Sequence, residues 1–281
     1  QCAWLLNYFP AEWMAAFLDK EPEKRKEKAI NIAKSFGFNI QPLDVNTSGT
    51  VWEISQDGKT LIQPLTSVKG LGEAAIAQIL DNRPFDTIEE FIFNEDIVYS
   101  KLNKKAIDVL IRSQALNGLM DERFTGLKHF WSSIIIERPK TKKKLNEKIL
   151  EYTDEGDFSK EEKIDYLSSL TGMFPLDMIL SDETRRKLDN QCIPSISEYD
   201  PMVPVCWFIA REVIKKTSKN GRDYFVVNVI DDTSKATTIR CWNVKPSDEI
   251  QVNKPYMANL KYDPNWGFST YSIKQNFRIL P

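Results

Sequence analysis

The sequence predicts an α+β protein of several domains, in which a mostly helical N-terminal part precedes a small β-barrel. Apolar residues recur at helical spacing, with Lys and Glu between them, through much of residues 11–170. After residue 204, five runs rich in β-branched and aromatic residues alternate with turn-forming segments. The change of period from helix to strand indicates where one fold class ends and the other begins.

The helical part contains one predicted interruption and several short helices. Residues 11–19 and 22–36 read as helices, and Asp57-Gly58 between "TVWEIS" and "TLIQPL" predicts a β-hairpin. Shorter helices follow, at 72–82, 86–93, 103–113 and about 121–131. Two helix starts have the spacing of a capping box, Asp86 with Glu89 and Ser159 with Glu162. Residues 132–160, which include the basic stretch "ERPKTKKKLNEK", read as a connector.

The stretch "SVKGLGEAAIAQIL" places Gly70 and Gly72 immediately before a helix. Two glycines there leave backbone N–H groups uncovered at the helix start, where a phosphate can bind. Lys69 adds a positive charge, whereas Glu73 opposes a nearby phosphate. A plain turn and a phosphate site are both open readings of this stretch taken alone.

Apolar residues on either side of the two glycines are spaced for a helix-hairpin-helix unit, a motif that holds duplex DNA by its phosphates. They are Leu65, Val68, Ile76, Ile79 and Leu80. A second copy is predicted at 102–119, where Gln114 stands in place of the expected glycine. We therefore expect the second copy to act mainly as scaffold.

Five strands in residues 204–281 favour a closed barrel of the OB type over a two-sheet sandwich. Residues 201–281 carry 12 Lys and Arg against 7 Asp and Glu, although the whole chain has a net charge of −2. The barrel is thus the better candidate for a polyanion partner. Four basic residues crowd its first hairpin, Lys215, Lys216, Lys219 and Arg222. Among the strand residues that follow, Tyr224 and Arg240 are candidate contacts for single strands, whereas Phe225 and Trp242 are expected in the core.

No catalytic motif is recognisable in the sequence. It contains no Asp-x-Asp pair, no Walker loop and no Gly-x-Ser-x-Gly elbow, and its only histidine, His129, reads as a packed or surface residue. The four cysteines form no Cys-x-x-Cys pair, so neither a zinc site nor any other metal site is expected. With no membrane-spanning stretch or signal peptide visible, we expect a cytoplasmic protein.

An ordered series of segments resembles the bacterial replicative DNA polymerases of the C family, the DNA polymerase III alpha subunits. The series runs from Tyr8 to at least Trp242: "YFPAEWMAAFL", "GFNIQPLDVN", "VKGLGEAAIAQIL", "PFDTIEEF", "LNKKAIDVLIRSQALNGL", "LSSLTGMFPLDMIL" and "FIAREVIKKTSKNGRDYFVVNVIDDTSKATTIRCW". The resemblance implies the distal fingers at 1–64, a tandem helix-hairpin-helix domain at 65–150, a helical connector at 151–203 and an OB-fold domain at 204–281. It also implies that the palm carboxylates and their Mg²⁺ belong to residues before Gln1, so that this chain carries no catalytic carboxylates or cofactor itself.

The resemblance further implies the partners and their contacts. Lys69, Gly70, Gly72 and Arg83 are the expected duplex contacts, and the basic residues of the OB hairpin are the expected single-strand contacts. The implied partners are DNA, as primed template, duplex and single strand, with a sliding clamp and other replisome proteins. The sequence departs from the family at Gln114, at Phe174 in place of a histidine, and in lacking a glutamine-led clamp peptide between 120 and 160. Such divergence fits a bacteriophage-type member.

Three other readings of the sequence remain open. One is a self-standing DNA-binding adaptor that uses the same two modules without a polymerase. Another is an RNA- or tRNA-binding OB protein. The last is an interaction module with no nucleic-acid role.

Overall fold

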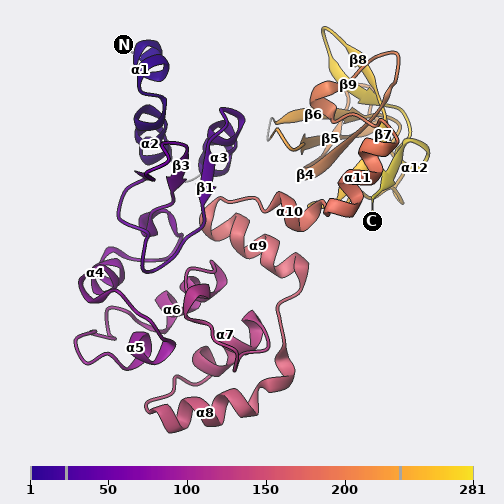
Figure 1. Cartoon of the computed structure of the whole chain (residues 1–281). Coiled ribbons are helices and arrows are strands. Elements are labelled where there is room, and N and C mark those ends of the chain that lie inside the picture. The colour runs from indigo at the N-terminus through magenta and orange to yellow at the C-terminus, as the bar shows by residue number, and fades with distance from the viewer. Residues whose placement is uncertain (1, 23–24, 234–235, 281) are drawn as a thin grey trace. The chain divides into compact units, whose positions relative to one another are not determined.

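The computed structural model describes residues 2–22, 25–233 and 236–280, with the side chains of residues 2 and 3 left out (Figure 1). It divides into two compact units, Gln1–Phe174 and Pro175–Pro281. The first is mostly helical and the second is built on a curled sheet, which confirms the predicted fold class. The finer division into four domains stays a prediction.

The first unit begins with three helices and a small sheet. The helices are α1 (Cys2–Tyr8), α2 (Pro10–Lys20) and α3 (Lys26–Ser35), and the strands are β1 (Asn39–Gln41), β2 (Glu53–Ile54) and β3 (Thr60–Ile62). The strand order is β1-β3-β2, with β2 and β3 antiparallel, so the hairpin predicted at Asp57-Gly58 is confirmed. Gly58 has a φ of +64°, a conformation that favours glycine. Met14, Ile30 and Leu61 join these elements in one apolar core.

The rest of the first unit packs around a second, larger core. Its elements are η2 (Leu65–Ser67), α4 (Glu73–Asn82), α5 (Ile88–Phe93), α6 (Lys104–Arg112), η3 (Asn117–Leu119), α7 (Leu127–Ile135), α8 (Lys142–Glu151), η4 (Thr153–Glu155) and α9 (Lys160–Thr171). The expectation of a connector at 132–160 is wrong. Leu145 and Ile149 of α8 are buried in this core, because the polar stretch still carries apolar residues one helical turn apart.

The predicted helix starts fare differently. The capping box of Ser159 and Glu162 is confirmed at α9. At α5 the N-cap is Thr87 rather than Asp86, since the Thr87 side chain accepts from the N–H of Glu90. The α7 helix begins at Leu127 and not near 121. Residues 121–126 form a loop there, and a Cβ on Gly126 would lie 2.6 Å from the carbonyl oxygen of Gly156.

The second unit places three short elements before its sheet. These are α10 (Leu176–Ile179), α11 (Asp182–Asn190) and η5 (Ile196–Glu198). The strands are β4 (Val205–Thr217), β5 (Asp223–Ile230), β6 (Thr237–Cys241), β7 (Pro255–Asn259), β8 (Lys261–Asp263), β9 (Gly267–Thr270) and β10 (Phe277–Ile279), with α12 (Ile273–Asn276) before the last. Their order is β10-β7-β4-β5-β6-β9-β8, and among these described strands β6 and β9 pair in parallel while the other neighbours are antiparallel.

The sheet closes on itself because β7 and β8, which pair with strands on opposite sides of the sheet, form one almost continuous segment of the chain. The strand β4 pairs with β7 through its first half and with β5 through its second, and a bulge between Ala210 and Glu212 bends it between the two. The strands β7 and β8 are separated by Leu260 alone, and β8 pairs with β9. The closed ring is β4-β5-β6-β9-β8/β7, in which β7 and β8 count as one member. It therefore has five members, which agrees with the five strand segments predicted from the sequence. This arrangement is that of an OB-type barrel (Figure 1).

The capping box of α9 makes a stability prediction. Ser159→Ala removes the acceptor for the N–H of Glu162 and is expected to lower the free energy of unfolding of the first unit by about 1 kcal/mol. Ser169→Ala, at an exposed position of the same helix, is the matched control and is expected to change it by less than about 0.5 kcal/mol. Denaturant unfolding followed by helical circular dichroism measures both. Equal effects would show that the cap does not stabilise α9.

Candidate nucleic-acid interface

The turn between η2 and α4 has the geometry that the two glycines predict. Gly70 has a φ of +89°, Leu71 is buried, and Gly72 is the N-cap of α4. No side chain of the described residues caps this helix. A Cβ placed on Gly72 has no described atom within 4 Å, so the backbone faces open space. The first N–H groups of α4 are therefore accessible to an anion, and the helix dipole favours one there.

The turn is held from two other helices. The N–H of Lys69 donates to the carbonyl oxygen of Leu170 in α9, at 2.8 Å. A Cβ on Gly70 would lie 3.6 Å from Cγ2 of Val109 in α6, which marks how closely this backbone approaches the helix. The turn is thus a rigid part of the larger core rather than a loose loop.

The remaining predicted duplex contacts differ in their surroundings. Lys69 is exposed beside the turn. Arg83 lies at the other end of α4, where its Nη1 donates to the carbonyl oxygen of Ser48 at 2.9 Å. Arg83 therefore ties α4 to the preceding loop, and the structure does not bring it to the Gly70 turn.

The second hairpin has a left-handed residue where the sequence lacks a glycine. Gln114 has a φ of +65°, and the N–H of Ala115 that follows it donates to the carbonyl oxygen of Leu110 at 2.9 Å. This bond closes the C-terminal end of α6. The Gln114 side chain accepts from Asn117, 3.3 Å away. Gln114 thus keeps the backbone shape of a glycine but adds a side chain over the turn.

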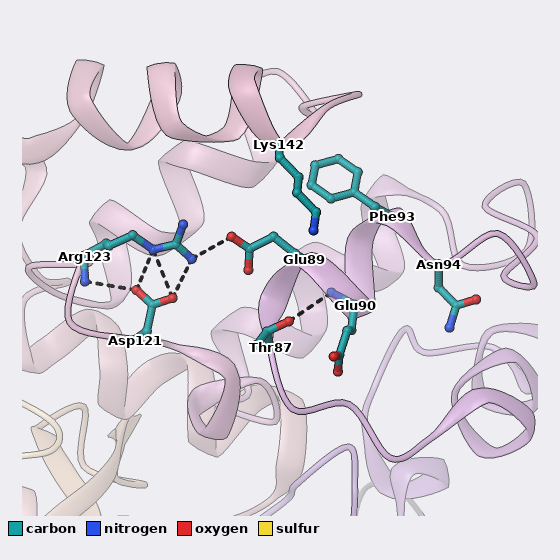
Figure 2. Close-up of a pocket in the computed structure, with 8 residues that line it drawn as sticks. All are labelled: Thr87, Glu89, Glu90, Phe93, Asn94, Asp121, Arg123 and Lys142. Atoms are coloured by element: carbon teal, nitrogen blue, oxygen red, sulfur yellow. Dashed lines mark hydrogen bonds and ion pairs between the residues drawn. The ribbon is translucent and has the colours of Figure 1, made fainter.

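A pocket of about 680 Å³ lies between α5, the loop before α7 and the start of α8 (Figure 2). Arg123 donates through Nη2 to Glu89 at 2.8 Å and through Nε to Asp121 at 2.9 Å. Hydrogen bonds from Arg123 hold the pKa of Asp121 below its usual range. Figure 2 shows Lys142 entering the pocket from α8, across from Glu89. We interpret this pocket as structural, because Arg123 is already paired with Glu89 and Asp121.

His129 is fully buried. Its Nδ1 accepts from the N–H of Thr125 at 3.0 Å, so its Nε2 donates to the carbonyl oxygen of Ile149 at 2.8 Å. The histidine joins α7 to α8, as a packed residue.

The basic residues of the barrel surround the turn between β4 and β5. Lys215 forms an ion pair with Asp223 at 2.7 Å, and hydrogen bonds from Lys215 and Thr217 lower the pKa of Asp223. Lys216 stands opposite Tyr224 in the antiparallel register, so both side chains lie on one face of the sheet. Lys219 and Arg222 are exposed in the turn itself.

An aromatic pair lies on the same face, and one of its members was not expected there. Tyr224 stacks on Trp242 with ring centroids 4.6 Å apart. Trp242 is only half-buried, so its assignment to the core is wrong, whereas Phe225 packs against the barrel core as expected. Position explains the difference, because Trp242 follows the last residue of β6 and lies beside Tyr224, on the side of the sheet away from Phe225 and Cys241.

A further aromatic residue escaped prediction altogether. Arg240 of β6 donates through Nη1 to the carbonyl oxygen of Trp266, in the turn between β8 and β9. The Trp266 side chain is 71% exposed. Its signal in the sequence is a tryptophan within the turn-forming stretch "DPNWG", where a core position is improbable.

Comparisons with known proteins relate this geometry to replication enzymes. A family model described as a helix-hairpin-helix motif matches residues 37–126. A DNA polymerase III subunit alpha from Pseudomonas aeruginosa is 30% identical over 144 residues, which are 49% of this chain and 12% of that protein. The subunit from Helicobacter pylori strain J99 is 30% identical over 159 residues, 52% of this chain and 13% of that protein. The resemblance to DNA polymerase III alpha subunits is confirmed.

The match covers only about an eighth of the length of these alpha subunits. Within the residues that the structure describes, no group of three or more His, Cys, Asp or Glu side chains could hold a metal ion. Burial raises the pKa of the Cys206 and Cys241 thiols to about 12, so both are protonated near neutral pH. Over the described ranges, no helix is both long and apolar enough to cross a membrane.

The junction at Arg123 makes a second stability prediction. Arg123→Met removes the hydrogen bonds to Glu89 and Asp121 and is expected to lower the free energy of unfolding of the first unit by about 1 kcal/mol, since the pair is partly exposed. Lys142→Met, in the same pocket, is the control and is expected to change it by less than about 0.5 kcal/mol. Denaturant unfolding measures both. A larger effect at Lys142 would contradict the structural role of Arg123.

Proposed function

We propose that this chain is the DNA-binding C-terminal part of a replicative DNA polymerase. It holds duplex DNA through the helix-hairpin-helix of its first unit and single-stranded template through its OB-type barrel. The observation that carries the proposal is the uncapped start of α4 at Gly72, set in a helix-hairpin-helix within a chain that resembles DNA polymerase III alpha subunits. The polymerase chemistry, with its Mg²⁺, would belong to another part of the enzyme.

The duplex role rests on backbone groups and one lysine. Gly70 and Gly72 shape a turn whose N–H groups are open, and the exposed ammonium of Lys69 adds a charge that a phosphate attracts. Such contacts hold a duplex without regard to its sequence, which is what a replicative polymerase requires. Arg83 contributes by fixing α4 rather than by touching the phosphate at Gly70.

The single-strand role rests on side chains of one barrel face. Tyr224 and Trp242 supply rings on which bases can stack, and Lys216 and Arg240 supply positive charge beside them. The exposed Trp266 supplies a further ring in the neighbouring turn, whose backbone carbonyl Arg240 contacts. Lys219 and Arg222 extend the positive charge into the turn between β4 and β5. In OB folds the middle strands and the loops that flank them are the usual surface for oligonucleotides.

A substitution at Gly72 tests the duplex role. The backbone of Gly72 has a φ of −81° and open space beyond, so Gly72→Val is compatible with the fold but places an isopropyl group where a phosphate would bind. We expect about a tenfold loss of affinity for duplex DNA, equivalent to the loss of one charge-assisted hydrogen bond. Fluorescence anisotropy at low salt measures the affinity.

The control is Ala77→Val, which introduces the same side chain at an exposed position one turn further along α4. It is expected to change the affinity less than twofold. Unchanged affinity of Gly72→Val for duplex DNA would show that this turn is structural and does not bind a phosphate.

A substitution at Asp223 tests the single-strand role through an expected increase in affinity. Asp223→Asn releases Lys215 from its ion pair and removes a negative charge from the site, so the affinity for single-stranded DNA is expected to rise about threefold at low salt. Asp189→Asn, at an exposed position of α11 in the same unit, makes the same charge change and serves as the control. An increase in both variants would mean that net charge, and not the Lys215 pair, decides the affinity.

A further inference from the structure

A groove of about 920 Å³ lies within the second unit, at the end of the barrel that carries the turn between β4 and β5. Three segments form it: that turn, the loop 242–246 after β6, and Tyr271 after β9. Its size is within the range of pockets that enclose small ligands. The stacking face proposed above leaves most of this groove unused.

Three of the residues that line the groove are aromatic, and each comes from a different segment of the barrel. Phe225 lines it from β5, Trp242 from the end of β6, and Tyr271 from the segment after β9. Tyr271 is 61% exposed, although it is a large ring beside a cavity. Tyr224 stacks on Trp242 but does not line the groove, so the part of the indole that borders the groove is not covered by that stack. The groove therefore offers flat apolar surfaces, of which the Trp242 ring is fixed by its stack on Tyr224.

Two of the segments that line the groove each carry an exposed basic residue. Arg222 projects from the turn between β4 and β5, and Lys245 from the loop after β6, and both are exposed. The one carboxylate in the lining, Asp223, is paired with Lys215. An anionic group that enters the groove therefore meets two positive charges. Among the described lining residues, no unpaired carboxylate repels it.

Two amide side chains complete the lining. Asn220 and Asn243 come from the same two loops as the cations, and both are exposed. An asparagine amide offers a donor and an acceptor at once, which matches the edge of a nucleobase. A nucleotide site needs three components. These are aromatic rings that stack on the face of the base, amides that bind its edge, and cations that bind the flanking phosphates.

We propose that this groove binds a single unstacked nucleobase of single-stranded DNA, between Trp242 and Tyr271, with the flanking phosphates on Arg222 and Lys245. The inference rests on the proposed function of the barrel and adds to it a site that selects for bases over a bare phosphate chain. An acidic peptide would satisfy Arg222 and Lys245 but would leave the three aromatic surfaces in water, so the lining favours a nucleotide.

The test compares two oligonucleotides of equal length and charge with the whole chain. One is a 12-residue oligothymidylate, and the other has the same backbone with every base removed. Tyr271→Ala is expected to weaken binding of the oligothymidylate about tenfold, because a base–aromatic stack is lost, and binding of the abasic chain less than twofold. Tyr271→Phe keeps the ring and is expected to retain the affinity.

Tyr262→Ala is the matched control. Tyr262 is a tyrosine of similar exposure, 51%, on β8, and it does not line the groove. It is expected to change the affinity for either oligonucleotide less than twofold. Circular dichroism checks that each variant is folded.

Four outcomes would overturn the proposal. Equal affinity of the unmodified chain for both oligonucleotides would remove the base site and leave the proposed single-strand binding intact. An equal loss for both in Tyr271→Ala would assign Tyr271 a structural role. Displacement of the oligothymidylate by a 12-residue oligo-aspartate at similar concentration would make the groove a site for acidic peptides. Binding of neither oligonucleotide at low salt would overturn the proposed function of the barrel as well.

Discussion

The turn at Gly70 depends on a backbone hydrogen bond from the N–H of Lys69 to the carbonyl of Leu170, far along the chain. That bond fixes one side of the turn against α9, while Val109 of α6 limits the other. Only glycine readily adopts the φ of +89° that this packing imposes at Gly70. The orientation of the N–H groups at the start of α4 is therefore set by three helices together, and α9 belongs to the same compact unit as the hairpin.

The two units present different chemistry to a nucleic acid. The first offers N–H groups at a helix start, which suit phosphates and carry no information about bases. The second offers rings and cations around Tyr224 and Trp242, which suit a strand whose bases are unpaired. Each surface forms entirely within one unit, so each can be altered without changing the other.

Local patterns in the sequence predicted the features that short segments determine. The Gly70-Leu71-Gly72 turn, the capping box at Ser159 and the five strand segments of the barrel all follow from residues within about ten positions of one another. The sequence also identified Gln114 as a departure, but not that its backbone would still adopt the left-handed conformation of a glycine.

Tertiary contacts decide what the local patterns missed. The polar composition of α8 concealed Leu145 and Ile149, which are buried only because α7 provides a surface for them. Trp242 reads as a core residue by its type, but its place one position beyond β6 puts it against Tyr224 on the other side of the sheet. The groove around Tyr271 joins segments that are distant in sequence, so no spacing rule could have brought them together.

The proposed function requires one chain to hold both duplex and single-stranded DNA. The most direct measurement is the affinity of the whole chain for a primed template, a blunt duplex and a single strand of matched length, each across a salt titration. We expect the tightest binding to the primed template, with the steepest fall of log affinity with log salt, because only that substrate offers both kinds of strand. Equal affinity for all three, or no binding to any of them at low salt, would contradict it.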